Sequence, residues 1–154
     1  MRVPIAWDSA VVQGLENFWY AVEHSASLAD KPISLGLLGR RYVLFRDAAG
    51  QPHALLDSCA HRGASLGGGW VEGNCLRCPY HGWSYDASGA PSNIPLHDEL
   101  YRYPAEERGA MRLREFALRP VGNLLFINLD PNPLPIEEQF DQAFIDLLES
   151  SSNA

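Results

Sequence analysis

Two short pairs of cysteine and histidine are the residues of this chain best suited to chemistry. Cys59 and His61 are separated by one residue, and Cys78 and His81 by two. Sixteen residues lie between the two pairs. Thiolate and imidazole together are suitable ligands for zinc, copper or an iron–sulfur cluster. The four residues are therefore candidate ligands of one metal centre.

Each pair mixes one sulfur ligand with one nitrogen ligand, which favours a centre with two unequal ends. A [2Fe–2S] cluster with cysteine on one iron and histidine on the other has this asymmetry. A structural zinc site instead groups like ligands, as C-x2–4-C followed by H-x3–5-H. Cys75 and Cys78 also match the C-x-x-C spacing of a redox thiol pair, but no thioredoxin-like βαβ unit surrounds them. We expect Cys75 to be a small, partly buried thiol.

The bulk composition is that of an ordinary globular protein. The 154 residues suffice for one domain with a core, and 46% are hydrophobic and 20% charged. A net charge of −7 argues against nucleic acid as a partner and suits docking onto a basic protein surface. No apolar run is long enough for a secretory leader or a membrane span. We therefore expect no membrane contact and a cytoplasmic location, where disulfides are rare.

The elements that must position the four ligands are predicted to be strands. Aromatic and β-branched runs bounded by turn residues are typical of antiparallel sheets. Such runs cover 17–24, 33–38, 42–46, 53–57, the two halves of 70–78, 83–86 and the two halves of 117–130. Gly39 and the Gly122-Asn123 pair are the expected turns of two hairpins. The stretch 87–95 is expected to be a loop.

After Pro135 the pattern changes from strand to helix. Pro135 and the two glutamates that follow it are typical of a helix start. The apolar face must pack on something, and we expect a partner or a further domain to cover it, although folding back onto the strands stays open. The last five residues are expected to fray. The residues with helical spacing are Ile136, Phe140, Phe144, Leu147 and Leu148.

The sequence around the ligands resembles a known family. "CAHRGASL" and "CPYHGWSYD" are similar to the two cluster-binding boxes of Rieske iron–sulfur proteins, in the variant of the bacterial ring-hydroxylating and demethylating Rieske non-haem iron oxygenases. The likeness runs from "FWYAVEHS" to "LLFINLDPNPLP", which is most of the chain. It implies a mostly β fold of small antiparallel sheets with a rubredoxin-like cluster-binding subdomain, plus a C-terminal helix. The expected division is a lead-in at 1–16, a Rieske domain at 17–132, and a helix with a polar tail at 133–154.

By this resemblance, Cys59 and Cys78 bind the buried iron of a Rieske-type [2Fe–2S] cluster, and His61 and His81 bind the outer iron. The glycines nearby let backbone N–H groups approach the cluster sulfurs, the proline stiffens its loop, and two aromatic side chains shield the cluster from water. Trp83 is equally well explained as an ordinary core residue. The residues expected around the cluster are Arg62, Gly63, Pro79, Tyr80, Gly82 and Trp83.

The chain departs from the family's other patterns in two ways. It lacks the extra cysteine pair found in the Rieske subunits of respiratory and photosynthetic complexes, so we exclude that branch. After His81 it has a single histidine, His97, whereas full oxygenases bind a mononuclear iron with two histidines and one carboxylate. We interpret "HDE" at 97–99 as a solvated loop.

The function implied by the resemblance is one-electron transfer. The electron would come from a reductase and go to a mononuclear iron on another oxygenase domain or subunit, and we expect no oxygen activation by this chain alone. Three settings stay open, which are a free-standing subunit, a ferredoxin-like carrier, and a part of a longer oxygenase or reductase fusion. The alternative class is a structural zinc or redox-sensing protein that uses the same ligands.

Overall fold

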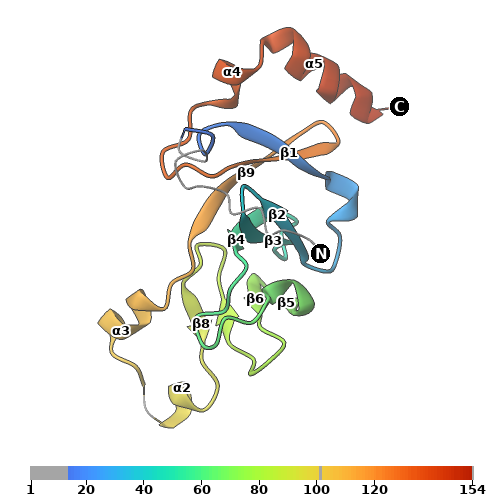
Figure 1. Cartoon of the computed structure of the whole chain (residues 1–154). Coiled ribbons are helices and arrows are strands. Elements are labelled where there is room, and N and C mark those ends of the chain that lie inside the picture. The colour runs from blue at the N-terminus through green and yellow to red at the C-terminus, as the bar shows by residue number, and fades with distance from the viewer. Residues whose placement is uncertain (1–13, 101, 154) are drawn as a thin grey trace, which may run out of the picture.

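The computed structural model describes residues 14–100 and 102–153, whose ten strands form two antiparallel sheets (Figure 1). The larger sheet has six strands in the order β1-β10-β9-β4-β3-β2. Pairing between β4 and β9 joins strands from the two ends of the chain. The bounds are β1 (Trp19–His24), β2 (Ile33–Leu37), β3 (Arg40–Arg46), β4 (Pro52–Leu56), β9 (Glu115–Val121) and β10 (Leu124–Asn128).

Two hairpins of the larger sheet turn at the glycines that the sequence predicts. Leu38 and Gly39 join β2 to β3, and their φ angles of 48° and 75° lie in the left-handed region. Positive φ at both central residues of a two-residue turn matches the twist of the flanking strands. Gly122, in the β9–β10 turn, has φ 57°, and a Cβ on it would collide with the backbone of Leu148. Glycine is therefore needed at this position for both the turn and the packing.

The smaller sheet carries the Cys-His stretch and has four strands in the order β5-β6-β7-β8. Their bounds are β5 (Trp70–Glu72), β6 (Cys75–Arg77), β7 (Ser84–Tyr85) and β8 (Pro91–Asn93), with the short 3-10 helix η2 (Leu66–Gly68) before them. Figure 1 shows this sheet on one side of the larger one. A shared core joins the two sheets, because Phe45 and Leu55 of the larger sheet pack with Leu76 and Tyr85 of the smaller one. Cys59 and Cys78 belong to the same core.

The predicted strands are confirmed, with small differences at their ends. The prediction of an unbroken loop at 87–95 is wrong, because β8 lies within it and pairs with β7. The interpretation of 97–99 as a loop is also wrong, because the backbone of these residues forms the helix α2 (His97–Leu100). The carboxylate of Asp98 explains this turn, since it accepts a hydrogen bond from the Ile94 N–H at 2.9 Å and pairs with Arg108. Arg108 lies on α3 (Ala105–Ala110), a helix that the sequence reading missed.

The C-terminal helix is broken into α4 (Ile136–Gln139) and α5 (Gln142–Ser150). Phe140 has an extended backbone, and the carboxylate of Asp141 caps α5 by accepting a hydrogen bond from the Phe144 N–H at 2.8 Å. Of the predicted apolar face, Ile136 is buried and Phe140 and Leu148 pack against the same cluster, as does the buried Ile145, which was not among the predicted residues; this side of the helices folds back onto the domain. This corrects the expectation that a partner or a further domain covers it. Leu147 alone of the face is strongly exposed, at 63%, and Phe144 is partly exposed.

Two remaining expectations concern the ends of the chain. Ser151–Asn153 form the short 3-10 helix η3, whereas the sequence predicted a frayed tail for the last five residues. Most of the expected lead-in at 1–16 lies outside the described residues, and the division at 17 and 133 stays a prediction. No helix in the described parts of the chain is long and apolar enough to cross a membrane.

Candidate metal centre

The two cysteines begin two loops, 59–64 and 78–83, that close in the same way. In each loop the cysteine N–H donates to the carbonyl five residues later, and a glycine N–H four residues later donates back to the cysteine carbonyl. Both glycines have left-handed φ angles, 72° and 76°, which a residue with a Cβ rarely adopts. The bonds are Cys59 to Ala64 at 2.9 Å and Gly63 to Cys59 at 2.7 Å in the first loop, and Cys78 to Trp83 at 2.8 Å and Gly82 to Cys78 at 3.2 Å in the second.

The thiols of Cys59 and Cys78 are buried, and neither cysteine is in a disulfide. Burial raises the pKa of Cys78, and the neighbouring Cys59 raises it further. The backbone N–H groups of Tyr80 and His81 act in the opposite direction, because they donate hydrogen bonds that favour the thiolate. The site therefore has two adjacent sulfur donors in a dry environment, with N–H groups placed to stabilise negative charge on sulfur.

Tyr85 supports the first loop from below and was missed in the sequence reading. Its buried hydroxyl accepts a hydrogen bond from the Ala60 N–H at 3.0 Å and lies 3.2 Å from the Sγ of Cys59. Burial raises the pKa of Tyr85, so the hydroxyl keeps its proton. Because one lone pair accepts from Ala60, the O–H is free to donate to the sulfur.

His61 and His81 face each other at the surface above the two thiols. Both residues are exposed, and their ring centroids lie 4.7 Å apart at an interplanar angle of 80°. The His61 ring also stacks on Trp83, with centroids 5.0 Å apart and an angle of 7°. The rings of the two histidines are therefore close enough to share one centre, with buried sulfur on its inner side.

The residues expected around the centre differ in their burial and in their contacts with the histidines. Trp83 is buried in the core and also stacks on His61, so it fits both of the interpretations given for it. Tyr80 lies 5.5 Å from His81 by ring centroids but is 74% exposed, so it covers the centre only from the solvent side. Arg62, Gly63 and Pro79 are exposed at the tips of the loops, and Gly82 is half-buried.

Cys75, as expected, is half-buried and lies on β6 opposite Glu72, away from the two loops.

Asp57, a second residue that the sequence reading missed, anchors the start of the first loop. Its carboxylate is fully buried and ties β2, η2 and the loop together. The only local signal was an acidic residue at the end of an apolar strand. Its partners are Ser34 Oγ at 2.6 Å, Ser65 Oγ at 2.8 Å, the N–H groups of Leu66 at 2.6 Å and Gly67 at 3.3 Å, and the guanidinium of Arg41 at 3.3 Å.

The chemistry of the four donors is compatible with a binuclear cluster. Within the described residues, no group of three or more His, Cys, Asp or Glu side chains is placed to hold one metal ion. A [2Fe–2S] cluster with mixed ligands requires only two side chains on each iron. Two buried sulfurs and two exposed imidazoles meet that requirement.

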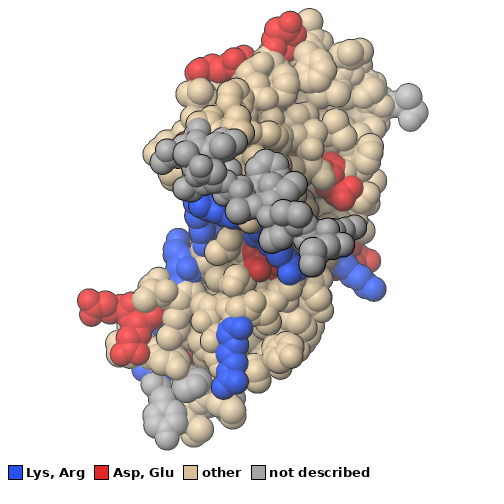
Figure 2. All heavy atoms as spheres, viewed as in Figure 1, with Lys and Arg blue, Asp and Glu red and all other residues tan. Residues whose placement is uncertain are grey.

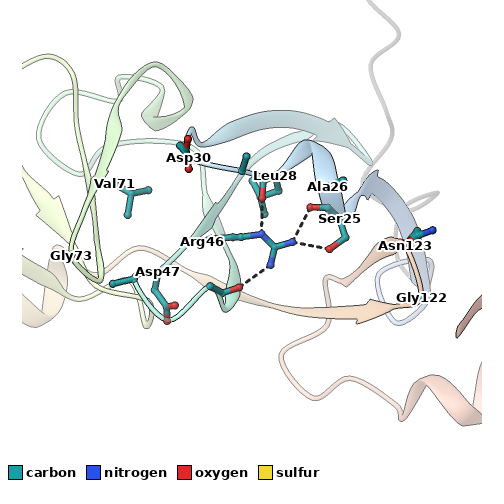
Figure 3. A pocket seen from close by; sticks show the side chains of 13 residues that line it. Ser25, Ala26, Leu28, Asp30, Arg46, Asp47, Val71, Gly73, Gly122 and Asn123 are labelled. Carbon is teal, nitrogen blue, oxygen red and sulfur yellow. Dashed lines mark hydrogen bonds between the residues drawn. The ribbon is translucent and has the colours of Figure 1, made fainter. Parts of the chain in front are cut away.

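A hollow in the surface lies elsewhere, and its lining has no such chemistry. Its volume is about 790 Å³, and none of the four candidate ligands lines it. Figure 3 shows Arg46 at its centre, where the guanidinium donates to the carbonyl oxygens of Leu28, Ser25 and Gly50. These bonds hold the short 3-10 helix η1 (Ser25–Ser27) and the β3–β4 turn together. Arg46 is therefore a structural residue.

Three comparisons with known proteins, by family model, by sequence and by structure, give the same family. The family model described as the Rieske [2Fe–2S] domain matches residues 18–104. The chain is 42% identical over 115 residues to the phenoxybenzoate dioxygenase subunit alpha of Ectopseudomonas oleovorans, covering 65% of this chain and 28% of that protein. It is 34% identical to the 4beta-methylsterol monooxygenase of Methylococcus capsulatus, covering 81% and 35%.

Among solved structures, Pseudomonas putida NdmA with caffeine is similar, with a TM-score of 0.69 and 31% identity over 77% of this chain and 35% of that one. Dicamba monooxygenase bound to dicamba is similar with a TM-score of 0.68 and 30% identity, over 79% of this chain and 36% of that one. The chain thus spans only about a third of the length of these relatives.

Proposed function

Because this chain belongs to the family of Rieske [2Fe–2S] domains and is homologous to Rieske oxygenase subunits, we propose that it transfers single electrons within an oxygenase system. The electron comes from a reductase and passes to a mononuclear iron on another domain or chain. The observation that carries this proposal is the layered arrangement of the donors, with two buried thiols beneath two adjacent, exposed imidazoles.

The residues that hold the cluster are Cys59 and Cys78 on the inner iron and His61 and His81 on the outer iron. When bound, a cluster of this type supplies reversible one-electron chemistry, at about −150 to +300 mV against about −400 mV for plant-type ferredoxins with cysteine ligands only. Neutral imidazoles in place of two thiolates reduce the negative charge of the centre, which favours reduction. Burial of the cysteines keeps water from the sulfur side, and exposure of the histidines offers a short path for the electron to a docked partner.

The alternative, a structural zinc or redox-sensing protein, is not favoured. The match to the Rieske [2Fe–2S] domain model and the homology to Rieske oxygenase subunits favour the binuclear cluster.

The partners of this electron transfer are part of the proposal. On the face shown in Figure 2, acidic side chains lie over α3 and over α4 and α5, with others between them, while Lys and Arg side chains lie across the middle and over the smaller sheet. Glu106 and Glu107 of α3 lie at the same end as the smaller sheet (Figure 1). This charge suits a basic surface on the reductase or on the oxygenase domain. A cytoplasmic location is also proposed, on the basis of the bacterial oxygenase relatives.

The experiment that tests the proposal is an EPR spectrum of the iron-replete protein after reduction with dithionite, with iron and acid-labile sulfide counted on the same sample. We expect a rhombic signal with a low average g value, and two irons and two sulfides per chain. A colourless, EPR-silent protein with one zinc ion per chain would overturn the proposal.

A further inference from the structure

An ion pair lies directly beneath the second cysteine loop. Arg77 is the last residue of β6 and immediately precedes Cys78. Its guanidinium lies against Gly82, because a Cβ built on that glycine would be 3.5 Å from both Nε and Nη2 of Arg77. Gly82 directly follows His81. A positive charge therefore lies against the second loop at Gly82, the residue after the proposed ligand His81.

Two neighbouring side chains, Glu72 and Trp70, keep the guanidinium of Arg77 in this position. Its Nη1 pairs with the carboxylate of Glu72, on the neighbouring strand β5, and its guanidinium carbon lies 5.8 Å from the centre of the Trp70 ring. The Arg77 side chain is 27% exposed and that of Glu72 is 63% exposed. Solvent therefore screens the negative charge more than the positive one.

A second observation separates Arg77 from an ordinary surface ion pair. Among the side chains of the described residues, the Nε of Arg77 is the one buried nitrogen or oxygen atom that has no hydrogen-bond partner. A buried N–H group without a partner is costly, and the pairing with Glu72 does not offset this cost at Nε. The position of the guanidinium under the loop therefore has no sufficient structural explanation in its hydrogen bonds.

We propose that the Arg77–Glu72 pair sets the reduction potential of the centre, with Arg77 raising the potential and Glu72 lowering it. This inference rests on the proposed function, since it requires a reducible cluster on the four ligands. Reduction adds one negative charge to the centre, so a nearby cation stabilises the reduced state and a nearby anion destabilises it. Because Arg77 is closer to the loop and less exposed, its effect is the larger of the two.

The test compares the midpoint potentials of the cluster-loaded wild-type protein and its variants at one pH and one ionic strength, with EPR as the readout. In Arg77→Gln we expect the equilibrium constant for reduction to fall about threefold, which is about 28 mV for a one-electron couple. Glu72→Gln should raise it by a smaller factor, and the double variant should lie between the two. Arg77→Lys keeps the charge and should stay nearer to wild type than Arg77→Gln.

The matched control is Arg119→Gln. Arg119 forms a similar ion pair with Glu137, at 2.6 Å, but this pair joins β9 to α4 and is partly exposed on both sides. Its loss should leave the potential unchanged, which separates a local effect from a change in net charge.

Two results would overturn the inference. One is an unmoved potential in both Arg77→Gln and Glu72→Gln with the EPR signal intact, and the other is a shift of both variants in the same direction. If Arg77→Gln fails to bind the cluster, Glu72→Gln becomes the test, because Glu72 is exposed and its substitution should leave folding intact. A midpoint potential of Glu72→Gln that does not rise above the wild-type value would then count against the inference. A wild-type protein without a rhombic EPR signal would instead contradict the proposed function itself.

Discussion

The loops 59–64 and 78–83 close with the same two hydrogen bonds, yet different side chains anchor them. The first loop is held by buried polar groups, with Asp57 at its start and the Tyr85 hydroxyl beneath it. The second loop is stiffened by Pro79 and lies on the guanidinium of Arg77. The histidine also differs in position, since it is the third residue of the first loop and the fourth of the second. The two loops therefore share one backbone conformation but give their ligands different surroundings.

The comparison suggests a division of roles between the loops. The buried hydrogen bonds of Asp57 mainly determine stability and the position of the first loop, whereas the Tyr85 hydroxyl contacts the sulfur of Cys59 directly. A charged pair beneath the second loop mainly affects the electrostatic potential at the centre. Substitutions next to the two loops should therefore have different consequences, although the ligands themselves should be equally necessary.

The largest effect is expected for a cysteine ligand. Cys78→Ser should abolish the rhombic EPR signal and the bound iron, because hydroxyl oxygen is a poor substitute for a thiolate ligand. Cys75→Ser is the matched control, three residues away and outside the loops, and should keep both. A cluster that survives in Cys78→Ser and is lost in Cys75→Ser would reverse the ligand assignment.

The next largest effect is expected for the histidine ligands, where the two loops can be compared directly. His61→Cys and His81→Cys each add the negative charge of a thiolate, so each should lower the midpoint potential, by about 100 mV or more. If the two histidines contribute equally to the outer iron, the shifts in midpoint potential of the two variants will be similar. An unchanged potential in a variant that keeps its cluster would remove that histidine from the ligand set.

Asp57 should have the largest effect on stability among the anchors of the first loop. Asp57→Ala leaves several buried hydrogen-bond donors without a partner, so the free energy of unfolding should fall by about 3 kcal/mol, as measured by urea denaturation. Asp86 is the control near the second loop, because its half-buried carboxylate accepts hydrogen bonds from the Ser88 and Ala90 N–H groups at 2.9 and 3.0 Å. Asp86→Ala should cost about 1 kcal/mol. Equal losses would contradict the special role of Asp57.

A smaller effect than that of the histidine ligands is expected for the hydroxyl of Tyr85. Tyr85→Phe removes the hydrogen bond to Cys59, which favours the more negatively charged, reduced centre, so the midpoint potential should fall by about 30–60 mV. The exposed Tyr80→Phe should leave the potential unchanged. A larger shift in Tyr80→Phe than in Tyr85→Phe would show that the hydrogen bond at 3.2 Å does not act on the centre.

Much of the fold near the ligands follows from local patterns. The strands, the turns at Gly39 and Gly122, and the two Cys-His boxes were all predicted, because alternation, turn residues and ligand spacing act over a few neighbouring residues. The errors lie in 87–110, which includes the missed helix α3, and in the C-terminal helix. There, β8 depends on pairing with β7, and the break between α4 and α5 depends on the cap formed by Asp141.

What the sequence determined by itself is the family, the kind of cluster and the four residues proposed to bind it. Only the tertiary structure decided how those residues are supported. Asp57 reaches Ser34, 23 residues away, and Tyr85 reaches Cys59, 26 residues away. The apolar face of α4 and α5 likewise folds back onto β1, β9 and β10. The physical reason is that such contacts depend on which strands become neighbours, and no local spacing rule encodes that.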